Sequence, residues 1–593
     1  MDRVDPLIST GEVLENFRWR VALDGDPLTD QEMTDLAEAR RPLIRLREHW
    51  VAADRTTLNR ARHHVLSGLT AMDALTAALN REIELEGERV PVVAIGAAAE
   101  TLRRLGREDA ALADLSEPYG LRATLRGYQR RGLAWLDDRC SLGLGCCLAD
   151  DMGLGKTITM IALHLHREAR RTSHGPTLIV CPPAVLDNWE REIRRFAPRT
   201  PVRLFHGPGR NLAGLQPDEM VVTTYGVLGH SYVLTRQQWG LVVADEAQKI
   251  KNPKSAAAGA IRSVPSQVRV ALTGTPVENR LSDVWSILDW TTPGLLGSFE
   301  SFRRRFGDPI EDGQDGSASA EASLKLARLL RPFILRRRKT DPGIAPELPP
   351  KTETEHVVGL TKQQAVLYEA ARREGMDRVT TAAKGARSME VMRLIQHLKQ
   401  ICNHPVQYQK TGRATPAQSR KLQLLDDLLE EIIPNGESVL VFSQYVAMLK
   451  LMEQHLQGQG IRTLMLDGSV AVARRAQLVE RFQSGEVPVF LLSLRAAGVG
   501  MNLTRASQVV HYDRWWNPAV EDQATDRAYR IGQDRPVQVH KFLTRGTIEE
   551  RIAELIRRKR MLADSVITSD GAALSRLTDA ELDDLIRLRN DPE

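Results

Sequence analysis

Short runs of mainly apolar residues recur along two parts of the chain, and amphipathic segments separate them. In the first part the runs fall at residues 178–181, 220–223, 241–244 and 268–272. In the second part they fall at 439–442, 487–493, 508–513 and 537–543. Such runs alternating with amphipathic helical segments are typical of parallel sheets covered by helices. The pattern therefore predicts an α/β protein with two parallel-sheet lobes.

The segments outside these two parts have mainly helical patterns. Residues 1–118 predict a mainly helical N-terminal accessory domain, in which one helix would begin at Thr29 with Glu32 at capping-box spacing. Residues 361–403 are also helical in pattern, and 389–401 are strongly amphipathic. This second segment predicts a helical insertion between the lobes.

Two polar segments indicate domain boundaries. Residues 307–323 are acidic and rich in glycine and serine, which predicts a mobile loop, and residues 341–350 hold several prolines, which predicts an extended linker. The predicted domains are 1–118 for the accessory domain, 119–345 for the first lobe with a helical insertion, 346–415 for a linker and helical insertion, 416–565 for the second lobe, and 566–593 for a C-terminal helical tail.

The charge, cysteine content and apolar runs of the chain limit the kinds of ligand and location that can be expected. The 81 lysines and arginines nearly balance 76 acidic residues, so any affinity for nucleic acid must come from local clusters such as residues 336–339. The five cysteines lack the paired spacing of a zinc site, so we expect reduced, buried thiols. No apolar run approaches about 18 residues. We therefore expect no membrane segment and a cytoplasmic location.

The segment LADDMGLGKT at 148–157 follows an apolar strand and precedes a helix, which is the context of a phosphate-binding loop. Gly153 and Gly155 would let backbone N–H groups approach phosphate oxygens, Lys156 would neutralise the β- and γ-phosphates, and the Thr157 hydroxyl would ligate Mg²⁺. Asp150 stands where the usual first glycine would be. The alternative, a glycine-rich turn without function, fits this context less well.

Two carboxylates, Asp245 and Glu246, end the apolar strand at 241–244. Ligands of α/β proteins bind at this edge of the sheet. An acidic pair there is by itself more often a helix cap or a solvated turn. About ninety residues after a phosphate-binding loop, however, the pair predicts that Asp245 holds hydrated Mg²⁺ and that Glu246 orients and deprotonates the attacking water.

Gln523, Arg527 and Arg530 fall at helical spacing, so they would share one face of a helix in the second lobe. An arginine that reaches from a second lobe stabilises the charge that develops during phosphoryl transfer. In isolation, a surface helix with its arginines bonded to acidic residues would be the first interpretation.

For several histidines and tryptophans, a structural role is the favoured interpretation. His164 and His166 lie two positions apart on a predicted helix and cannot share a metal ion, and His404 favours a structural role. Trp515 and Trp516 could stack on a base, but aromatic packing is the favoured interpretation.

In chain order these motifs resemble those of Swi/Snf-type ATPases, a branch of helicase superfamily two. The resemblance covers roughly residues 120–565 and rests on LRGYQRRG (125–132), DDMGLGKT (150–157), LIVCPPAVLDNW (178–189), DEAQKIKN (245–252), ALTGTPVEN (271–279), RPFILRRRK (331–339), LKQICNHP (398–405), VFSQY (441–445), LDGS (466–469), SLRAAGVGMNLTRA (493–506) and WWNPAVEDQATDRAYRIGQ (515–533). The N-terminal stretch resembles the accessory domain of bacterial members, which often carry further residues upstream, and this leaves open whether the chain is a shortened or a short natural form.

The resemblance implies two RecA-like lobes with ATP and Mg²⁺ bound between them. It assigns adenine recognition to Gln129 and catalysis to Lys156, Glu246, Arg527 and Arg530. Further positions implied to bind the nucleotide are Asp151, Met152, Gly153, Leu154, Gly155, Thr157 and Gly500. Positions implied to contact DNA or to couple the lobes are Gln248, Thr273, Thr275, Ser443, Gln444, Asn502 and Gln523. Gln248 and Tyr529 stand where many relatives have histidine, and these departures concern coupling rather than chemistry.

The resemblance also implies a function: ATP-driven movement along double-stranded DNA without classical strand unwinding, by a monomeric, nucleoid-associated motor of a bacterium. Relatives displace proteins from DNA, assist repair, recycle polymerase or act in phage defence, and protein partners would use the N-terminal domain. Two alternatives are an RNA-dependent or strand-separating helicase and a slow, nucleotide-gated clamp. The helical insertions and the RIGQ ending disfavour the first, and the intact base and arginine fingers disfavour the second.

Overall fold

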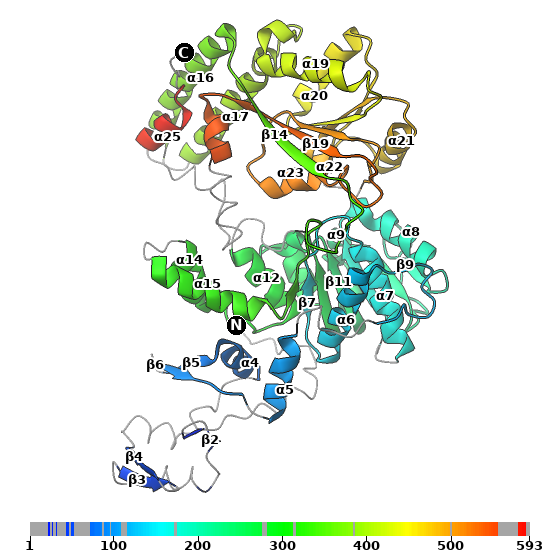
Figure 1. The fold of residues 1–593 in the computed structure, drawn as a ribbon, viewed down its shortest axis with the longest axis vertical. Helices are drawn as coiled ribbons and strands as arrows, with labels where there is room; N and C mark the ends of the chain where they lie inside the picture. Colours follow the sequence, from blue (N-terminus) through cyan, green and yellow to red (C-terminus); the bar gives the residue numbers. More distant parts are fainter. Residues whose placement is uncertain are drawn as a thin grey trace.

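The computed structural model describes residues 22–23, 26–27, 31, 43–46, 49–52, 71–85, 88–94, 96–107, 115–170, 175–274, 281–311, 316–383, 386–497, 501–554 and 579–588. Two α/β lobes lie one above the other, and the described N-terminal elements adjoin the lower, first lobe (Figure 1).

The first lobe is built on a seven-stranded sheet in which all pairings are parallel. In spatial order its strands are β13 (Ile334–Leu335), β7 (Cys146–Leu148), β12 (Ser266–Leu272), β11 (Trp239–Asp245), β8 (Thr177–Cys181), β10 (Met220–Thr224) and β9 (Val202–Leu204). Successive side chains of a strand point to opposite faces. Ile179 accordingly joins the core on one face of this sheet, whereas Leu178 and Val180 join the core on the other. The first predicted parallel sheet is confirmed.

Helices cover both faces of this sheet and extend from one of its edges. They are α6 (Gly127–Ser141), α7 (Lys156–Ala169), α8 (Leu186–Phe196), α9 (Tyr225–Leu228), α10 (Tyr232–Arg236), α11 (Ala256–Arg262), α12 (Leu281–Thr291), α13 (Phe299–Phe302), α14 (Asp308–Glu311) and α15 (Gly316–Leu330), with the single-turn helices η2 (Pro183–Val185) and η3 (Ala247–Ile250) and the π-helix η4 (Arg303–Gly307).

The prediction of a mobile loop at 307–323 is wrong, because α14 and α15 occupy much of that segment. The three alanines at positions 318, 320 and 322 are good helix formers within the segment that becomes the start of α15. Leu326 and Leu329 of α15 also pack into a core that contains Phe302 and Phe306. Tertiary burial therefore adds to a helical preference that the glycine and serine content had hidden.

The second lobe has a six-stranded sheet, again with all pairings parallel. In spatial order its strands are β14 (Lys351–Val358), β19 (Val537–Thr544), β18 (Gln508–His511), β15 (Val439–Ser443), β17 (Val489–Ser493) and β16 (Thr463–Leu466). The helices are α16 (Lys362–Thr381), α17 (Arg387–Asn403), α18 (Pro405–Gln409), α19 (Arg420–Ile432), α20 (Val446–Gly458), α21 (Val472–Gln483), α22 (Leu494–Ala497), α23 (Pro518–Thr525) and α25 (Asp579–Ile586), with the 3₁₀ turn η5 (Pro416–Gln418). The second predicted sheet and the helical insertion are thus present.

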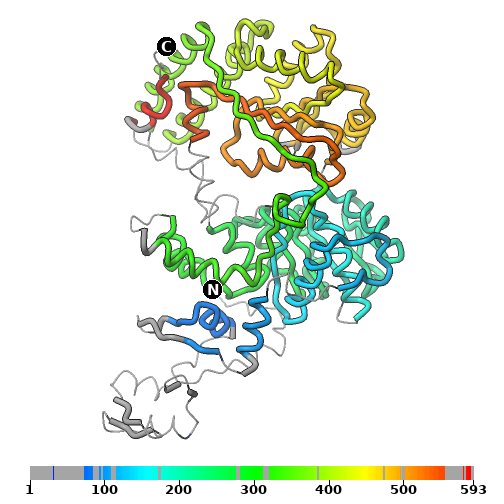
Figure 2. The backbone as a smooth tube through the Cα atoms, in the orientation of Figure 1, coloured from blue at the N-terminus to red at the C-terminus, as the bar shows by residue number. Residues whose placement is uncertain are grey.

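The chain passes from the first lobe to the second along β14 (Figure 2). The sequence assigns these residues to a linker, but β14 pairs with β19 over its whole length, from Lys351 opposite Val537 to Val358 opposite Thr544. Most side chains of β14 are exposed and polar. An edge strand of this kind lacks the apolar run by which the other strands were predicted.

The described N-terminal residues combine helices with antiparallel strand pairs, whereas the sequence predicts a mainly helical domain. These elements are β1 (Ala22–Leu23), β2 (Asp26–Pro27), β3 (Leu43–Leu46), β4 (His49–Ala52), α4 (Ala71–Asn80), β5 (Glu82–Leu85), β6 (Glu88–Pro91) and α5 (Gly96–Leu105). The predicted capping box at Thr29 and Glu32 lies outside the described residues.

All five cysteines are buried free thiols, as expected. None of the helices in the described part of the chain has both the length and the apolar character needed to cross a membrane.

Candidate active site between the two lobes

The turn between β7 and α7 has the backbone of a phosphate-binding loop. Gly153 and Gly155 have φ values of 87° and 82°, which side-chain-bearing residues rarely adopt. A Cβ on Gly155 would also lie 2.4 Å from Nε2 of Gln129. Lys156 begins α7, and its Nζ donates to the carbonyl oxygens of Asp150 (2.5 Å) and Asp151 (3.3 Å). The ammonium of Lys156 therefore lies against the carbonyl groups at the start of the loop, and the glycines give the loop the backbone conformation that phosphate binding requires.

Asp150, which replaces the usual first glycine, is buried and held by Arg337. Nε of Arg337 donates to Oδ1 of Asp150 at 2.9 Å, and Nη2 donates to Oδ2 at 2.5 Å. A third guanidinium nitrogen donates to the carbonyl oxygen of Tyr128. A bidentate, fully satisfied pair is the arrangement in which a buried carboxylate is tolerated.

Asp245, at the end of β11, has both carboxylate oxygens engaged. Oδ2 accepts from Nε1 of Trp189 at 2.8 Å, and Oδ1 accepts from the backbone N–H of Glu246 at 2.9 Å. Burial and the adjacent Glu246 raise the pKa of Asp245 to about 7. Two half-buried neighbouring carboxylates would be stabilised by a cation, so this corner of the site fits a divalent metal ion.

Glu246, Gln248 and Thr273 form a chain of hydrogen bonds. Nε2 of Gln248 donates to Oε2 of Glu246 at 2.6 Å, and Oε1 of Gln248 accepts from the Thr273 hydroxyl at 3.0 Å. Glu246 itself has a left-handed backbone, with φ 51° and ψ 54°. The amide of Gln248 therefore links the carboxylate to the end of β12 without a titrating group. Thr275 lies outside the described residues.

Arg527 and Arg530 of the second lobe lie against the phosphate-binding loop of the first. Nη2 of Arg527 lies 3.8 Å from Sδ of Met152, and a Cβ on Gly153 would meet Cγ of Arg530 at 2.8 Å. Burial lowers the pKa of Arg527 to about 10, although the nearby Glu246 opposes this shift. Within the described residues, the buried Nε of Arg527 has no hydrogen-bond partner. This free donor beside the loop fits a phosphate oxygen.

The sequence predicts that the two arginines share a helix with Gln523. The structure shows that they do not. The helix α23 ends at Thr525, and residues 526–530 form tight turns. One reason is tertiary: the carbonyl oxygen of Arg527 accepts a hydrogen bond from the N–H of Leu503. The alternative of a surface helix does not apply to Arg527, which is only 2% exposed.

Gln129 is buried near the loop, and its amide is engaged within the protein. Its Oε1 accepts from the N–H of Arg126 at 2.9 Å, and its Nε2 donates to the carbonyl oxygen of Leu154 at 3.1 Å. The side chain thus joins the start of α6 to the phosphate-binding loop. Adenine recognition by Gln129 stays a prediction.

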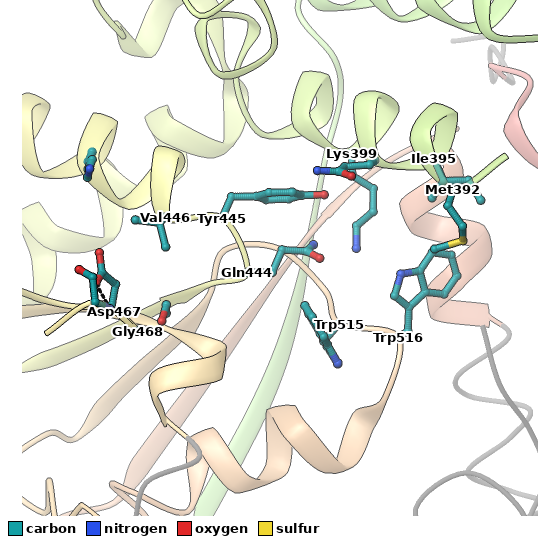
Figure 3. A pocket seen from close by; sticks show the side chains of 14 residues that line it. Met392, Ile395, Lys399, Gln444, Tyr445, Val446, Asp467, Gly468, Trp515 and Trp516 are labelled. Carbon is teal, nitrogen blue, oxygen red and sulfur yellow. Dashed lines mark hydrogen bonds between the residues drawn. The ribbon is translucent and has the colours of Figure 1, made fainter. Parts of the chain in front are cut away.

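A second group of predicted residues lies at the end of β15 in the second lobe. Asp513 accepts hydrogen bonds from the Ser443 hydroxyl and, at 3.0 Å, from the N–H of Gln444. Gln444 lines a cavity of about 830 Å³ (Figure 3) whose other lining residues are Met392, Ile395, Gln396, Lys399, Tyr445, Val446, Lys450, Asp467, Gly468, Ser469, Ser493, Trp515 and Trp516. Trp515 and Trp516 each pack partly into a core and also line this cavity.

The remaining predicted residues do not all join these two sites. Gln523 is half-buried on α23, Asn502 is exposed, and Gly500 lies outside the described residues. The histidines have structural partners: Nδ1 of His164 lies 2.9 Å from the Thr177 hydroxyl, and Nδ1 of His404 accepts from the N–H of Val406. Among the described residues, no group of three or more His, Cys, Asp or Glu side chains is arranged to hold a metal ion by itself.

Sequence reasoning missed three residues of the site. Trp189 contacts Asp245 from 56 positions earlier in the chain, and no local pattern marks that contact. Arg337 and Lys339 belong to a basic cluster considered as a source of nucleic-acid affinity, but both are buried, whereas Arg336 and Arg338 are exposed. The basic cluster at 336–339 was therefore a correct signal for function. The burial of Arg337 and Lys339 beside the phosphate-binding loop shows that these two residues belong to the nucleotide site and not to a nucleic-acid surface.

The fold and this site define a class: a two-lobed α/β protein with a phosphate-binding loop in one lobe and arginines contributed by the other. The chain belongs to the Swi/Snf-type family of helicase superfamily two. Residues 128–407 match the SNF2-related domain, residues 420–532 match the helicase conserved C-terminal domain, and residues 7–79 match a domain described as SNF2 helicase protein.

Two curated relatives and one solved structure illustrate the similarity. The putative ATP-dependent helicase/translocase YwqA of Bacillus subtilis is 39% identical over 97% of this chain and 64% of its own length. The human SWI/SNF-related matrix-associated actin-dependent regulator of chromatin subfamily A member 1 is 34% identical over 78% of this chain and 45% of its own length. The SWI2/SNF2 ATPase core of Sulfolobus solfataricus in complex with double-stranded DNA is 38% identical, covers 81% of this chain and 100% of that chain, and has a TM-score of 0.41. The chain thus spans about half to two thirds of the length of these curated relatives.

Proposed function

We propose that this chain is a DNA-dependent ATPase that moves along double-stranded DNA without separating its strands. The observation that carries the proposal is the contact of Arg527 and Arg530 with Met152 and Gly153, because it makes a complete hydrolytic site depend on closure of the two lobes. A cycle of closure and opening is the motion by which a two-lobed motor grips and releases a track.

The first lobe supplies the groups that hold the nucleotide and its metal ion. Lys156 and the N–H groups around Gly153 and Gly155 would hold the phosphates, with the positive end of α7 directed at them. Thr157 and Asp245 would provide oxygen ligands for Mg²⁺, which takes few protein ligands when phosphate oxygens complete its shell. When bound, Mg²⁺ supplies charge neutralisation at the phosphates.

Glu246 is the proposed general base. Its hydrogen bond from Gln248 at 2.6 Å fixes the carboxylate while leaving the other oxygen for a water molecule. Thr273 at the other end of the chain of hydrogen bonds would convey the state of the base to the rest of the lobe. Because glutamine does not titrate, this linkage would keep the same hydrogen bonds across the physiological pH range.

Arg527 and Arg530 are the proposed arginine fingers. The guanidinium of Arg527 is buried beside Met152 with one donor free, so it can form a charge-assisted hydrogen bond with a γ-phosphate oxygen at little cost in reorganisation. Such fingers typically contribute a factor of about 10³ to 10⁵ in rate.

The cavity of the second lobe is the proposed place of DNA contact on that lobe. The exposed Lys450, the amide of Gln444 and the Ser469 hydroxyl suit a phosphate backbone, and Trp515 adds an aromatic face. Contacts of this kind do not depend on base sequence, which suits a protein that moves along DNA. Thr273, Asn502 and Gln523 are proposed to help couple such contacts to the nucleotide site.

The proposal keeps the predicted cellular setting and the predicted domain organisation, except that β14 joins the sheet of the second lobe. Residues 1–118 would be the accessory domain that protein partners contact, and the match of residues 7–79 to a domain of SNF2 helicase proteins supports this assignment. The motor would act as a monomer in the cytoplasm of a bacterium, associated with the nucleoid, where it would displace proteins from DNA, assist repair, recycle polymerase or act in phage defence.

The test is ATP turnover with different nucleic acids at constant protein concentration. We expect strong stimulation by blunt double-stranded DNA, weaker stimulation by single-stranded DNA or RNA, and no separation of a forked duplex. Equal stimulation by single-stranded RNA would assign the chain to an RNA-dependent helicase. Nucleotide binding without turnover on any nucleic acid would instead indicate a gated clamp.

A further inference from the structure

The chain that leaves β13 lies along the phosphate-binding loop. The N–H of Asp151 donates to the carbonyl oxygen of Arg337 at 3.0 Å, and the N–H of Lys339 donates to Oδ2 of Asp151 at 2.9 Å. Together with the bidentate pair of Arg337 and Asp150, these bonds attach the segment to the loop residues that precede Gly153. The backbone of Lys339 is therefore fixed with respect to the nucleotide site of the first lobe.

The side chain of Lys339 crosses to the second lobe. Its Nζ donates to Oδ1 of Asp526 at 2.7 Å and to the carbonyl oxygen of Tyr529 at 2.5 Å. Asp526 directly precedes Arg527, and Tyr529 directly precedes Arg530. One ammonium thus holds the turn that carries both arginines at two points.

The ion pair of Lys339 and Asp526 is buried, so removing one of its two charges should lower the stability of the folded protein. The Lys339 side chain is 3% exposed. Burial lowers the pKa of Lys339, although Asp526 opposes the shift, and burial raises the pKa of Asp526, although Lys339 opposes that shift. Removing one partner of such a pair leaves an uncompensated charge.

The ring of Tyr529 belongs to the same contact. Nζ of Lys339 lies 5.2 Å from the centroid of its ring, and Nζ of Lys351 lies 5.7 Å from it. Both distances suit cation–π attraction. A neutral phenol ring tolerates two neighbouring ammonium groups.

We propose that Lys339 is a positioning residue that sets the register of Arg527 and Arg530 against the phosphate-binding loop. The inference rests on the proposed ATPase function. Lys339 touches neither of the proposed catalytic carboxylates, and its action is to hold the finger-bearing turn at the distance from Asp151 that places the arginines beside Met152 and Gly153. Its contacts with Asp526 and Tyr529 join the two lobes in the arrangement described here, so they also favour that arrangement.

The test compares Lys339→Met and Lys339→Arg with Lys351→Met as a matched control. Lys351 lies near the same ring, but its Nζ pairs with Glu353, so Lys351→Met removes one cation–π contact with Tyr529 and leaves both hydrogen bonds from Lys339 to the turn in place. Because a misplacement of about 1 Å can cost about 10²-fold in rate, we expect Lys339→Met to lower DNA-stimulated kcat by about 10- to 100-fold. The KM for ATP should stay within about twofold, Lys339→Arg should recover part of the rate, and Lys351→Met should stay near wild type.

A second readout does not depend on activity. Spin labels at Gln216→Cys and Gln457→Cys, which are exposed on the two lobes, would report the distance between the lobes without nucleotide, since the five native cysteines are buried. The variant Lys339→Met/Asp526→Asn removes the unpaired carboxylate and so avoids a folding defect. We expect it to broaden the distance distribution, and Lys351→Met to leave it unchanged.

The two readouts separate the inference from the proposed function. If wild type hydrolyses ATP with DNA and Lys339→Met matches its kcat, the positioning role is overturned. If wild type shows no turnover, the proposed function fails, and the distance measurement then tests the role of Lys339 by itself. A distance distribution in the double variant like that of wild type overturns this role, and a broadened distribution supports it.

Discussion

Arg530 packs directly on Gly153, since a Cβ built on that glycine would lie 2.8 Å from Cγ of the arginine. Gly153 also has a φ of 87°. Gly153→Ala would therefore strain the phosphate-binding loop and displace Arg530 together. We expect DNA-stimulated turnover to fall by more than about tenfold, in line with the loss from misplaced catalytic groups. The matched control is Gly209→Ala, where φ is 79° but no atom lies within 4 Å of the added Cβ. Similar losses of turnover in both variants would mean that backbone strain alone, and not contact with Arg530, matters.

Replacing either arginine with lysine keeps the charge and removes the planar fork that contacts two phosphate oxygens. We expect Arg527→Lys and Arg530→Lys each to lower DNA-stimulated kcat by about 10²-fold or more, with Arg530→Lys the more severe. Affinity for ATP without DNA should change little, because the proposed phosphate-binding groups belong to the first lobe. Turnover and nucleotide titration measured on the same preparations check both statements. Normal turnover in both variants would contradict the role of the second lobe in hydrolysis.

Substitutions of Lys156 and Glu246 should affect different steps, the first nucleotide binding and the second ATP hydrolysis. Lys156→Ala removes the ammonium at the start of α7 and should weaken nucleotide binding. Glu246→Gln keeps a group that can hydrogen-bond a water molecule but cannot accept its proton, so nucleotide should still bind while turnover is lost. Equilibrium binding of a fluorescent ATP analogue beside steady-state turnover makes the comparison. Near-normal hydrolysis by Glu246→Gln would show that another group is the base.

The stability of the second lobe should fall in mild acid because of His511. Burial lowers the pKa of this histidine to about 4, and its Nε2 lies 2.9 Å from the Thr525 hydroxyl. The unfolded chain takes up a proton near pH 6.5, whereas the folded chain resists it until about pH 4, so stability is present above the first pH and is lost as the pH falls toward the second. The slope from this group is about 1.4 kcal/mol per pH unit. Urea denaturation at pH 7.5, 6 and 5 should show a smaller loss for His511→Asn than for wild type, and equal losses would contradict the assignment.

DNA affinity should depend on Lys450, which is exposed at the cavity of the second lobe. If Lys450 contacts a phosphate, Lys450→Ala should weaken binding equally for different sequences and reduce the salt slope by about one. Lys362, exposed at the start of α16 and not part of the cavity lining, provides the matched control Lys362→Ala. Fluorescence anisotropy of labelled duplexes at several salt concentrations measures both quantities. An unchanged slope in Lys450→Ala would place the DNA contact elsewhere.

The features that depend on local pattern could be predicted from the amino-acid sequence. The run predicted at 178–181 became β8 (Thr177–Cys181), and that at 220–223 became β10 (Met220–Thr224), because strands buried on both faces are mainly apolar along their length. The phosphate-binding loop was equally predictable, since its backbone at Gly153 and Gly155 requires glycine.

Which distant segments meet became known from the folded structure and could not be predicted from local pattern. No periodicity encodes that Trp189 bonds to Asp245, that Arg337 satisfies the carboxylate of Asp150, or that Lys339 is buried. Sequence pattern indicates whether a side chain prefers water or the protein interior. It does not indicate that a lysine in a basic run, such as Lys339, is buried against a carboxylate 187 positions away. The polar strand β14 and the turn that ends α23 before Arg527 were missed for the same reason, because hydrogen bonds from remote segments stabilise both.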